Sequence, residues 1–202
     1  MIAHVRGRLT AKSADRVVIE TAGGVGYEVT VPLGVMVETP AAAVLADRFV
    51  EISDFLSVGT NDLTQYTLVV DRGNARLADR FTPHDPSVLR LLKLVAEAAR
   101  SAGKPASVCG EMASEPLSAF LLLGLGYETL SVAPPALPFI KWLIRQVTTE
   151  QARAAADAAL AARSAELALD ILRFALAEAV DLTLLDPDAR LPAGRRSGNF
   201  RL

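Results

Sequence analysis

From Gly34 onward, short apolar runs alternate with longer segments of helical periodicity, and this alternation constrains the possible folds more than any other feature. The runs lie at residues 35–37, 55–58, 106–109 and 130–132. They are too continuously apolar for strands with one solvated face, so they predict a parallel sheet covered by its helices. Four consecutive strand–helix units are typical of half of a (β/α)8 TIM-type barrel or of a small open α/β sheet.

The helical period is clearest at residues 86–102, where apolar side chains recur at intervals of three and four residues. Pro86 suits the first turn of a helix, because its missing N–H is not needed there. Gly103 suits the position just past a helix end. The sequence therefore predicts a helix between these two residues.

Alanine-rich sequence after Thr149 favours two helices, at residues 150–160 and 164–179. Thr149 and Ser164 precede runs of strong helix formers and are the candidate N-caps. Beyond these helices the periodicity disappears, and proline, glycine and arginine become frequent. Residues 180–202 are therefore expected to form a disordered tail.

Residues 1–33 have a different pattern, in which apolar and polar side chains alternate as they do in half-buried strands. Runs at 16–20 and 26–31 follow each other at hairpin spacing, and the AGGVG between them supplies turn residues. This segment is expected to form a small antiparallel β meander. The predicted organisation therefore has three parts, at residues 1–33, 34–179 and 180–202.

Composition limits the classes of function. The 202 residues include 51% apolar side chains, 21 basic and 23 acidic residues, and the formal charge is −2. This balance gives no whole-chain reason to expect nucleic acid or an anionic membrane as partner. The single cysteine excludes an internal disulfide and fits a reducing compartment. Because no apolar signal core or membrane-spanning stretch is present, we expect a soluble cytoplasmic protein.

Chemically active side chains follow three of the four predicted strands. Glu38 follows the first, Asn61 and Asp62 follow the second, and Cys109 ends the third. Because parallel barrel strands present functional groups at their carboxyl ends, we expect these side chains to meet at one edge. Glu38 and Asp62 offer the oxygen ligands that Mg²⁺ prefers. Arg72 adds a planar donor group that suits phosphate.

Each of these residues also has a plainer explanation. The plainer explanations are a solvated loop residue for Glu38, a turn or helix cap for Asn61 and Asp62, a buried filler for Cys109 and a surface position for Arg72. Cys109 acts as a proton donor or nucleophile only where neighbouring groups activate its thiol. His4 and His84 are isolated in the sequence, without metal-ligand spacing, and neither is assigned a role.

Several motifs resemble the phosphoenolpyruvate-binding barrel of enzyme I of the sugar phosphotransferase system. Pyruvate phosphate dikinase and phosphoenolpyruvate synthase share the pattern. The motifs are GVMVETPAAA (34–43), FLSVGTNDLTQYTL (55–68), VDRGN (70–74) and VCGEMA (108–113). Several long motifs in the right order make the resemblance specific, and it continues in segments as far as residue 179.

The resemblance implies a role for each candidate residue. Glu38 and Asp62 would hold the Mg²⁺ ion that bridges phosphoenolpyruvate. Asn61 and Arg72 would bind the phosphate of this substrate. Cys109 would protonate the enolate carbon when pyruvate forms. The implied function is phosphoenolpyruvate-protein phosphotransfer, with phosphoenolpyruvate or pyruvate as ligand and a phosphocarrier protein as a possible partner.

The sequence lacks two parts of that family's pattern, the first half of the barrel and a phosphohistidine domain. A complete catalytic cycle is therefore not expected of this chain alone. Residues 1–33 instead resemble the first strands of RuvA, a Holliday-junction DNA-binding protein whose strands open an oligonucleotide-binding barrel. The segment would then be a partial OB-fold, and the whole sequence would be a chimera with its junction near Leu33 and Gly34.

Three functions remain open at this stage: a phosphotransferase-type enzyme, a RuvA-like DNA-binding module, and a non-catalytic chimeric or designed scaffold. The near-neutral charge makes DNA the weaker prediction. A four-stranded parallel sheet leaves two unpaired edges, which favour association with another chain. We therefore expect a homodimer or another homo-oligomer, for instance two copies that close into one barrel.

Overall fold

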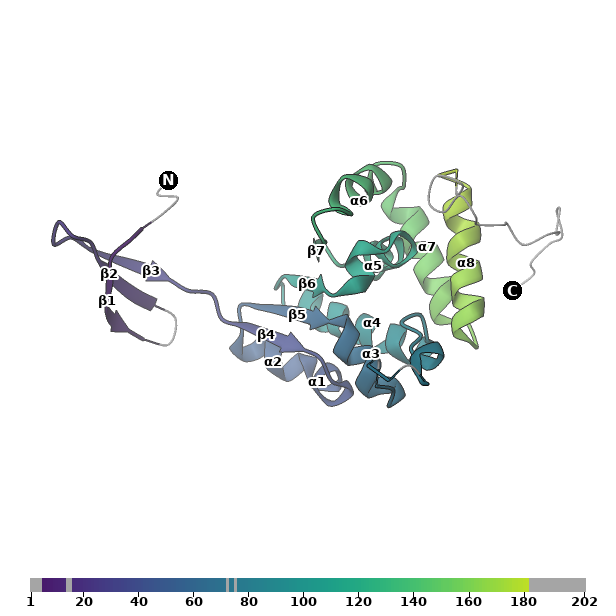
Figure 1. The fold of residues 1–202 in the computed structure, drawn as a ribbon, viewed down its shortest axis with the longest axis horizontal. Coiled ribbons are helices and arrows are strands. Elements are labelled where there is room, and N and C mark those ends of the chain that lie inside the picture. Colours follow the sequence, from purple (N-terminus) through teal and green to yellow (C-terminus); the bar gives the residue numbers. More distant parts are fainter. Residues whose placement is uncertain (1–4, 14–15, 72, 75, 182–202) are drawn as a thin grey trace.

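The computed structural model describes residues 5–13, 16–71, 73–74 and 76–181, in which two sheets occupy different parts of the chain (Figure 1). The first sheet has three antiparallel strands in the order β1-β2-β3. The second has four parallel strands in the order β4-β5-β6-β7. The predicted combination of a parallel α/β sheet with a small antiparallel meander is confirmed. The strands are β1 Arg8–Lys12, β2 Arg16–Glu20, β3 Gly26–Thr30, β4 Gly34–Val37, β5 Phe55–Gly59, β6 Ala106–Cys109 and β7 Thr129–Ser131.

Helices follow every strand of the parallel sheet. After β4 come α1 Pro40–Val44 and α2 Ala46–Ile52, and after β5 come α3 Thr60–Leu68, the 3-10 helix η1 Ala78–Arg80 and α4 Pro86–Ser101. After β6 come the 3-10 helix η2 Glu111–Ser114 and α5 Pro116–Leu125. After β7 come α6 Leu137–Ile144, α7 Thr149–Leu160 and α8 Ala165–Ala177.

The two faces of the parallel sheet differ in burial. Val37, Val58 and Val108 lie side by side on neighbouring strands and are 0% exposed, packed in the core with the helices. Successive side chains of a strand point to opposite faces, so Met36 and its partner Ser57 lie on the other face. Met36 is 51% exposed. Helices on one face are what half of a (β/α)8 barrel would have, and closure into a barrel stays a prediction.

Helix α5 lies very close to α7. Gly124 in α5 has no side chain, and a Cβ atom at that position would overlap the carbonyl group of Ala152 in α7. The buried residues of α7 are all alanines, which let the two backbones approach each other. The alanine-rich sequence that predicts a helix thus also permits the close contact between the two helices.

The helix ends largely follow the predicted signals. Helix α4 begins at Pro86 and its N-cap is Asp85, whose side chain accepts a hydrogen bond from the N–H of Ser87. Ser164 caps α8, as predicted. The predicted N-cap Thr149 is wrong by one residue, because Thr148 caps α7. Thr148 and Gln151 form a reciprocal capping box, in which each side chain accepts from the main-chain N–H of the other residue.

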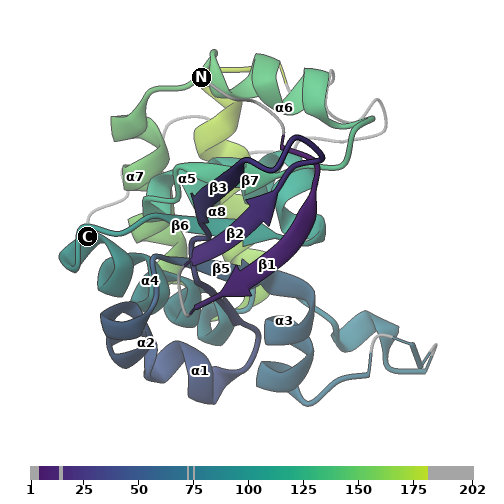
Figure 2. The same cartoon turned by 90° about the vertical axis from the view of Figure 1, so that its left-hand side faces the viewer.

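The antiparallel sheet β1–β3 stands apart from the helices (Figure 1), and in Figure 2 its strands face the viewer in front of the rest of the chain. All residues of β1 are exposed, and the described residues of β2 and β3 are exposed or half-buried. The chain enters the parallel sheet through a reciprocal contact between Leu33 and Asp54. The N–H of Leu33 donates to Oδ2 of Asp54 at 2.7 Å, and the N–H of Asp54 donates to the carbonyl of Leu33 at 2.7 Å.

Part of the predicted tail, residues 182–202, lies outside the described residues, as does His4. Val180, at the start of the predicted tail, is 6% exposed and belongs to the core cluster. Within the described ranges, none of the helices combines the length and the apolar content that crossing a bilayer requires.

Candidate functional site

The carboxyl ends of β4 and β5 bring Glu38 close to the start of α3. Val37 pairs with Val58, so Glu38 follows β4 at the level where β5 ends in Gly59. A Cβ atom on Gly59 would lie 2.6 Å from Oε1 of Glu38, which is closer than real Cβ atoms approach an oxygen. A side chain at this position would displace the Glu38 side chain, because the Glu38 carboxylate packs directly against the backbone that leads into Asn61 and Asp62.

Asn61 connects the start of α3 to the loop that follows β6. Its Oδ1 accepts a hydrogen bond from the N–H of Glu111 at 3.2 Å. The neighbouring Thr60 hydroxyl donates to the carbonyl of Cys109 at 3.3 Å. Gly110 has φ +116°, and a Cβ atom there would overlap the Thr60 hydroxyl. The ends of β5 and β6 are thus held together by contacts that only a glycine at 110 permits.

Asp62 lies in the first turn of α3, where a negative charge is favoured by the helix dipole. Among the described residues, neither Asp62 nor Glu38 makes a hydrogen bond or an ion pair through its side chain. Both residues are half-buried. Two carboxylates without protein partners, on adjacent strand ends, suit a hard divalent cation that takes its other ligands from substrate and water.

The described part of the chain contains no group of three or more His, Cys, Asp or Glu residues placed to hold a metal ion. A metal bound by Glu38 and Asp62 would therefore have two protein ligands. Mg²⁺ is commonly bound in this way, through one or two carboxylates together with substrate phosphate oxygens and water. The residues present fit that ion, and they do not form an all-protein cage.

Cys109 lies at the end of β6, on the sheet face away from the core helices. Its sulfur is 3.4 Å from the carbonyl of Val58, 3.7 Å from Sδ of Met36 and 3.8 Å from the hydroxyl of Ser57. All three neighbouring groups are neutral. The thiol is half-buried and lies one residue before Gly110, at the same edge of the sheet as Asn61.

Arg72, the fifth predicted site residue, lies outside the described residues. The chain near it leaves α3 through Val69, which has φ 53° and is 87% exposed. A left-handed conformation is unfavourable for a β-branched residue. Strained backbone of this kind is often found beside functional loops.

A shallow open pocket of about 520 Å³ lies at the carboxyl ends of β6 and β7. Its lining residues are Asn61, Gly110, Glu111, Ser114, Glu115, Pro116, Ser131 and Ala133. Ser114 also accepts a hydrogen bond from the N–H of Ala133 at 2.9 Å, which ties the loops after β6 and β7 together. Glu38 and Asp62 do not line this pocket, so the predicted metal ligands lie outside its wall.

Sequence reasoning identified Asn61 but missed Ser114, Glu115 and Ser131. Ser131 ends β7 and pairs with Cys109, so the rule that strand ends carry functional groups would have found it. Glu115 is the N-cap of α5, and the sequence signal for it is the proline that follows at position 116. Ser114 has no such signal, because its contact to Ala133 depends on the folded chain.

Together, the parallel sheet and the side chains at its strand ends define an α/β protein that carries carboxylates, an amide and a thiol at the carboxyl ends of its parallel strands. Comparison with known proteins makes the class more specific. Residues 1–149 match the family of the PEP-utilising enzyme, PEP-binding domain, and the chain therefore belongs to this family. The matched range includes β1–β3 as well as the whole parallel sheet.

Relatives support the same assignment. The chain is 46% identical over 134 residues to the phosphoenolpyruvate-protein phosphotransferase of Haemophilus influenzae, covering 66% of this chain and 23% of the relative. It is 40% identical over 157 residues to the protein of that name in Listeria monocytogenes, covering 78% and 27%. Multiphosphoryl transfer protein 1 of Escherichia coli is 40% identical over 143 residues, covering 71% and 17%. The chain spans about a quarter or less of the length of these curated relatives.

Proposed function

We propose that this chain binds phosphoenolpyruvate together with Mg²⁺ and contributes to phosphoryl transfer of the phosphoenolpyruvate-protein phosphotransferase type. The observation that carries the proposal is the placement of Glu38 against Gly59, directly before Asn61 and Asp62. Membership of the PEP-utilising enzyme family and the similarity to proteins named phosphoenolpyruvate-protein phosphotransferase support it.

In this proposal the residues divide the work of positioning and protonation. Glu38 and Asp62 hold the metal ion, which when bound neutralises charge on the transferring phosphoryl group. Asn61 and Arg72 orient the phosphate. Cys109 gives its thiol proton to the methylene carbon of the enolate that remains when the phosphoryl group departs, and pyruvate is the product.

In this proposal the phosphoryl group passes to a phosphocarrier protein or to a phosphohistidine domain. We place the chain in the cytoplasm. Among the described strands, β4 and β7 each have one edge of the parallel sheet without a partner, and we propose that a second copy of the chain pairs with these edges. Light scattering at micromolar concentration tests this, and a strictly monomeric species would contradict it.

Titration calorimetry of the full chain with phosphoenolpyruvate, with and without Mg²⁺, tests the binding proposal. We expect heat only when both are present, and Asp62→Asn should weaken the affinity by about tenfold or more because a charged ligand is lost. Asp47→Asn is the matched control, since Asp47 also lies in the first turn of a helix, α2, and its side chain is 67% exposed. No heat from the wild-type chain with both ligands present would overturn the proposal.

The resemblance of residues 1–33 to RuvA, and with it a chimeric origin, stays a separate hypothesis. Arg16 lies 2.8 Å from Glu28 and Arg8 lies 4.0 Å from Glu20, so each of these cations has a carboxylate beside it. A surface with so little net positive charge attracts the phosphate backbone of DNA only weakly. Salt-sensitive binding of branched DNA, without phosphoenolpyruvate binding, would favour the RuvA-like function. A well-defined fold that binds neither ligand would favour a non-catalytic scaffold.

A further inference from the structure

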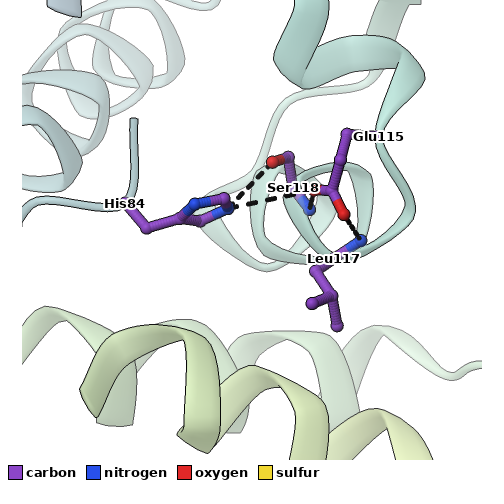
Figure 3. Close-up of polar contacts among 4 residues, drawn as sticks. All are labelled: His84, Glu115, Leu117 and Ser118. Atoms are coloured by element: carbon purple, nitrogen blue, oxygen red, sulfur yellow. Dashed lines mark hydrogen bonds and ion pairs between the residues drawn. The ribbon is translucent and has the colours of Figure 1, made fainter. Parts of the chain in front are cut away.

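His84 is a buried residue that the proposed chemistry does not use. It lies between η1 and α4 and is 8% exposed. Its Nε2 is 2.9 Å from the hydroxyl oxygen of Ser118, in the first turn of α5 (Figure 3). Ser118 is itself 1% exposed. Because a buried polar group without a partner is costly, each of these two side chains satisfies the other.

The side chain of Glu115 lies beside both His84 and Ser118. It is the N-cap of α5, and its Oε1 accepts from the N–H of Leu117 at 3.1 Å while its Oε2 accepts from the N–H of Ser118 at 2.6 Å. The same Oε2 lies 3.9 Å from Nε2 of His84 (Figure 3). Ser118 is therefore held twice, by Glu115 through its main chain and by His84 through its side chain.

The segment that these contacts hold is one wall of the candidate site. Glu111, Ser114 and Glu115, which lie between the end of β6 and the start of α5, all line the pocket together with Asn61. Asn61 contacts the beginning of this loop, where its side chain accepts from the N–H of Glu111. The imidazole of His84 lies at the end of the loop, beside Glu115 and Ser118 at the start of α5.

We propose that His84 is a positioning residue, which acts through Ser118 and Glu115 to hold the loop at residues 110–116 in place against Asn61. The inference rests on the proposed function, since this loop contacts Asn61, to which the proposal assigns the phosphate of phosphoenolpyruvate. His84 does not reach the pocket itself, so it acts only through the residues that it holds.

The charged groups around His84 decide which form of the imidazole does this. Burial lowers the pKa of His84, Glu115 from the start of α5 raises it, and Arg173 from α8 lowers it, with burial as the largest influence. The pKa of His84 is lowered overall, so the imidazole is neutral at pH 7. A neutral ring offers Ser118 one hydrogen bond, as donor or acceptor according to its tautomer.

Three variants of the full chain test the role. His84→Leu fills the space but removes the hydrogen bond, and Ser118→Ala removes the same bond from the other side with a good helix former. His84→Gln is the matched control, because its amide places a polar atom near the position of Nε2 and does not titrate. Amide hydrogen exchange of the peptide covering residues 110–118 is compared with that of α2, Ala46–Ile52, in each variant.

We expect exchange of residues 110–118 to become about tenfold faster in His84→Leu and Ser118→Ala, as the loss of one buried hydrogen bond implies. Exchange of α2 should stay unchanged, and His84→Gln should restore slow exchange. Equal acceleration in both segments, or no acceleration in either variant, would overturn the positioning role.

Affinity for phosphoenolpyruvate with Mg²⁺, measured on the same variants, should fall in His84→Leu and Ser118→Ala and recover in His84→Gln. A loss of affinity that His84→Gln does not restore would also overturn the role. If the wild-type chain binds no phosphoenolpyruvate, the proposed function fails, whereas the exchange measurement still decides whether His84 orders the loop.

Discussion

The two sheets of this protein are built from similar strand lengths but differ in what surrounds them. Strands β4–β7 lie against a continuous core that includes residues from all of the helices α1–α8. The described residues of β1–β3 contribute nothing to that core. An alternating sequence is thus enough for strands to pair, whereas a sheet buries its apolar side chains only where helices or other elements cover it.

The antiparallel sheet has an apolar face whose described residues lie outside the core cluster. Leu9 pairs with Ile19 and Ile19 with Tyr27, which places their side chains on one face. Leu9 is nevertheless 57% exposed. The parallel sheet should therefore account for most of the stability, and the antiparallel sheet for little of it.

Paired leucine truncations test this difference most strongly. Leu56→Ala in β5 removes a side chain that is 0% exposed, and we expect a loss of about 3 kcal/mol in the free energy of unfolding. Leu9→Ala in β1 should cost less than about 0.5 kcal/mol, because the side chain remains largely in water. Urea denaturation followed by circular dichroism measures both, and equal losses would contradict the comparison.

The helical part of the chain should also make the free energy of unfolding depend on pH in the acid range. The pKa of His84 is lowered in the folded state, so the unfolded chain binds a proton more readily as the pH falls below about 6.5. Stability should therefore fall as the pH is lowered from 7 towards the folded-state pKa and then become independent of this group. His84→Gln should remove this contribution, as melting temperatures across the range would show, whereas identical pH profiles for the two proteins would contradict it.

Backbone strain offers a smaller test. The hairpin between β2 and β3 places a glycine, Gly24, at φ 75°, whereas the end of α3 places Val69 at φ 53°. Val69→Gly should stabilise the protein by about 1 kcal/mol, because the left-handed conformation costs a β-branched residue more than it costs glycine. The matched change Val44→Gly, in α1, should destabilise, since Val44 is exposed in an ordinary helix.

The smallest effect is expected when the antiparallel sheet is removed. A chain that starts at Pro32 keeps the reciprocal contact between Leu33 and Asp54. Its unfolding free energy should stay within about 0.5 kcal/mol of that of the full chain. Calorimetric melting checks this, and a loss comparable to that of Leu56→Ala would show that β1–β3 stabilise the helical part.

Periodicity predicted most of the fold because it depends on local sequence and a single buried face. The helix predicted at residues 86–102 is observed as Pro86–Ser101. The strand predicted at 130–132 is observed one residue earlier, as Thr129–Ser131. The N-cap of α7 was misplaced at Thr149, because both Thr148 and Thr149 are good caps and only the position of Gln151 decides between them.

The candidate site was less predictable, because several of its contacts join residues that are far apart in sequence. The rule for strand ends predicts Glu38, Asn61, Asp62 and Cys109 as candidates from the sequence alone. The rule does not predict the contact of Asn61 with Glu111, 50 residues away in the sequence, or that of His84 with Ser118, 34 residues away. A histidine that stands alone in the sequence is therefore not isolated in the fold.

The position of the chain's single cysteine has a practical consequence. Cys109 lies half-buried on the sheet face that carries Met36 and Ser57. A maleimide spin label or fluorophore therefore attaches at one known point, without removal of other thiols. Its signal would report directly on whatever molecule comes to rest on that face.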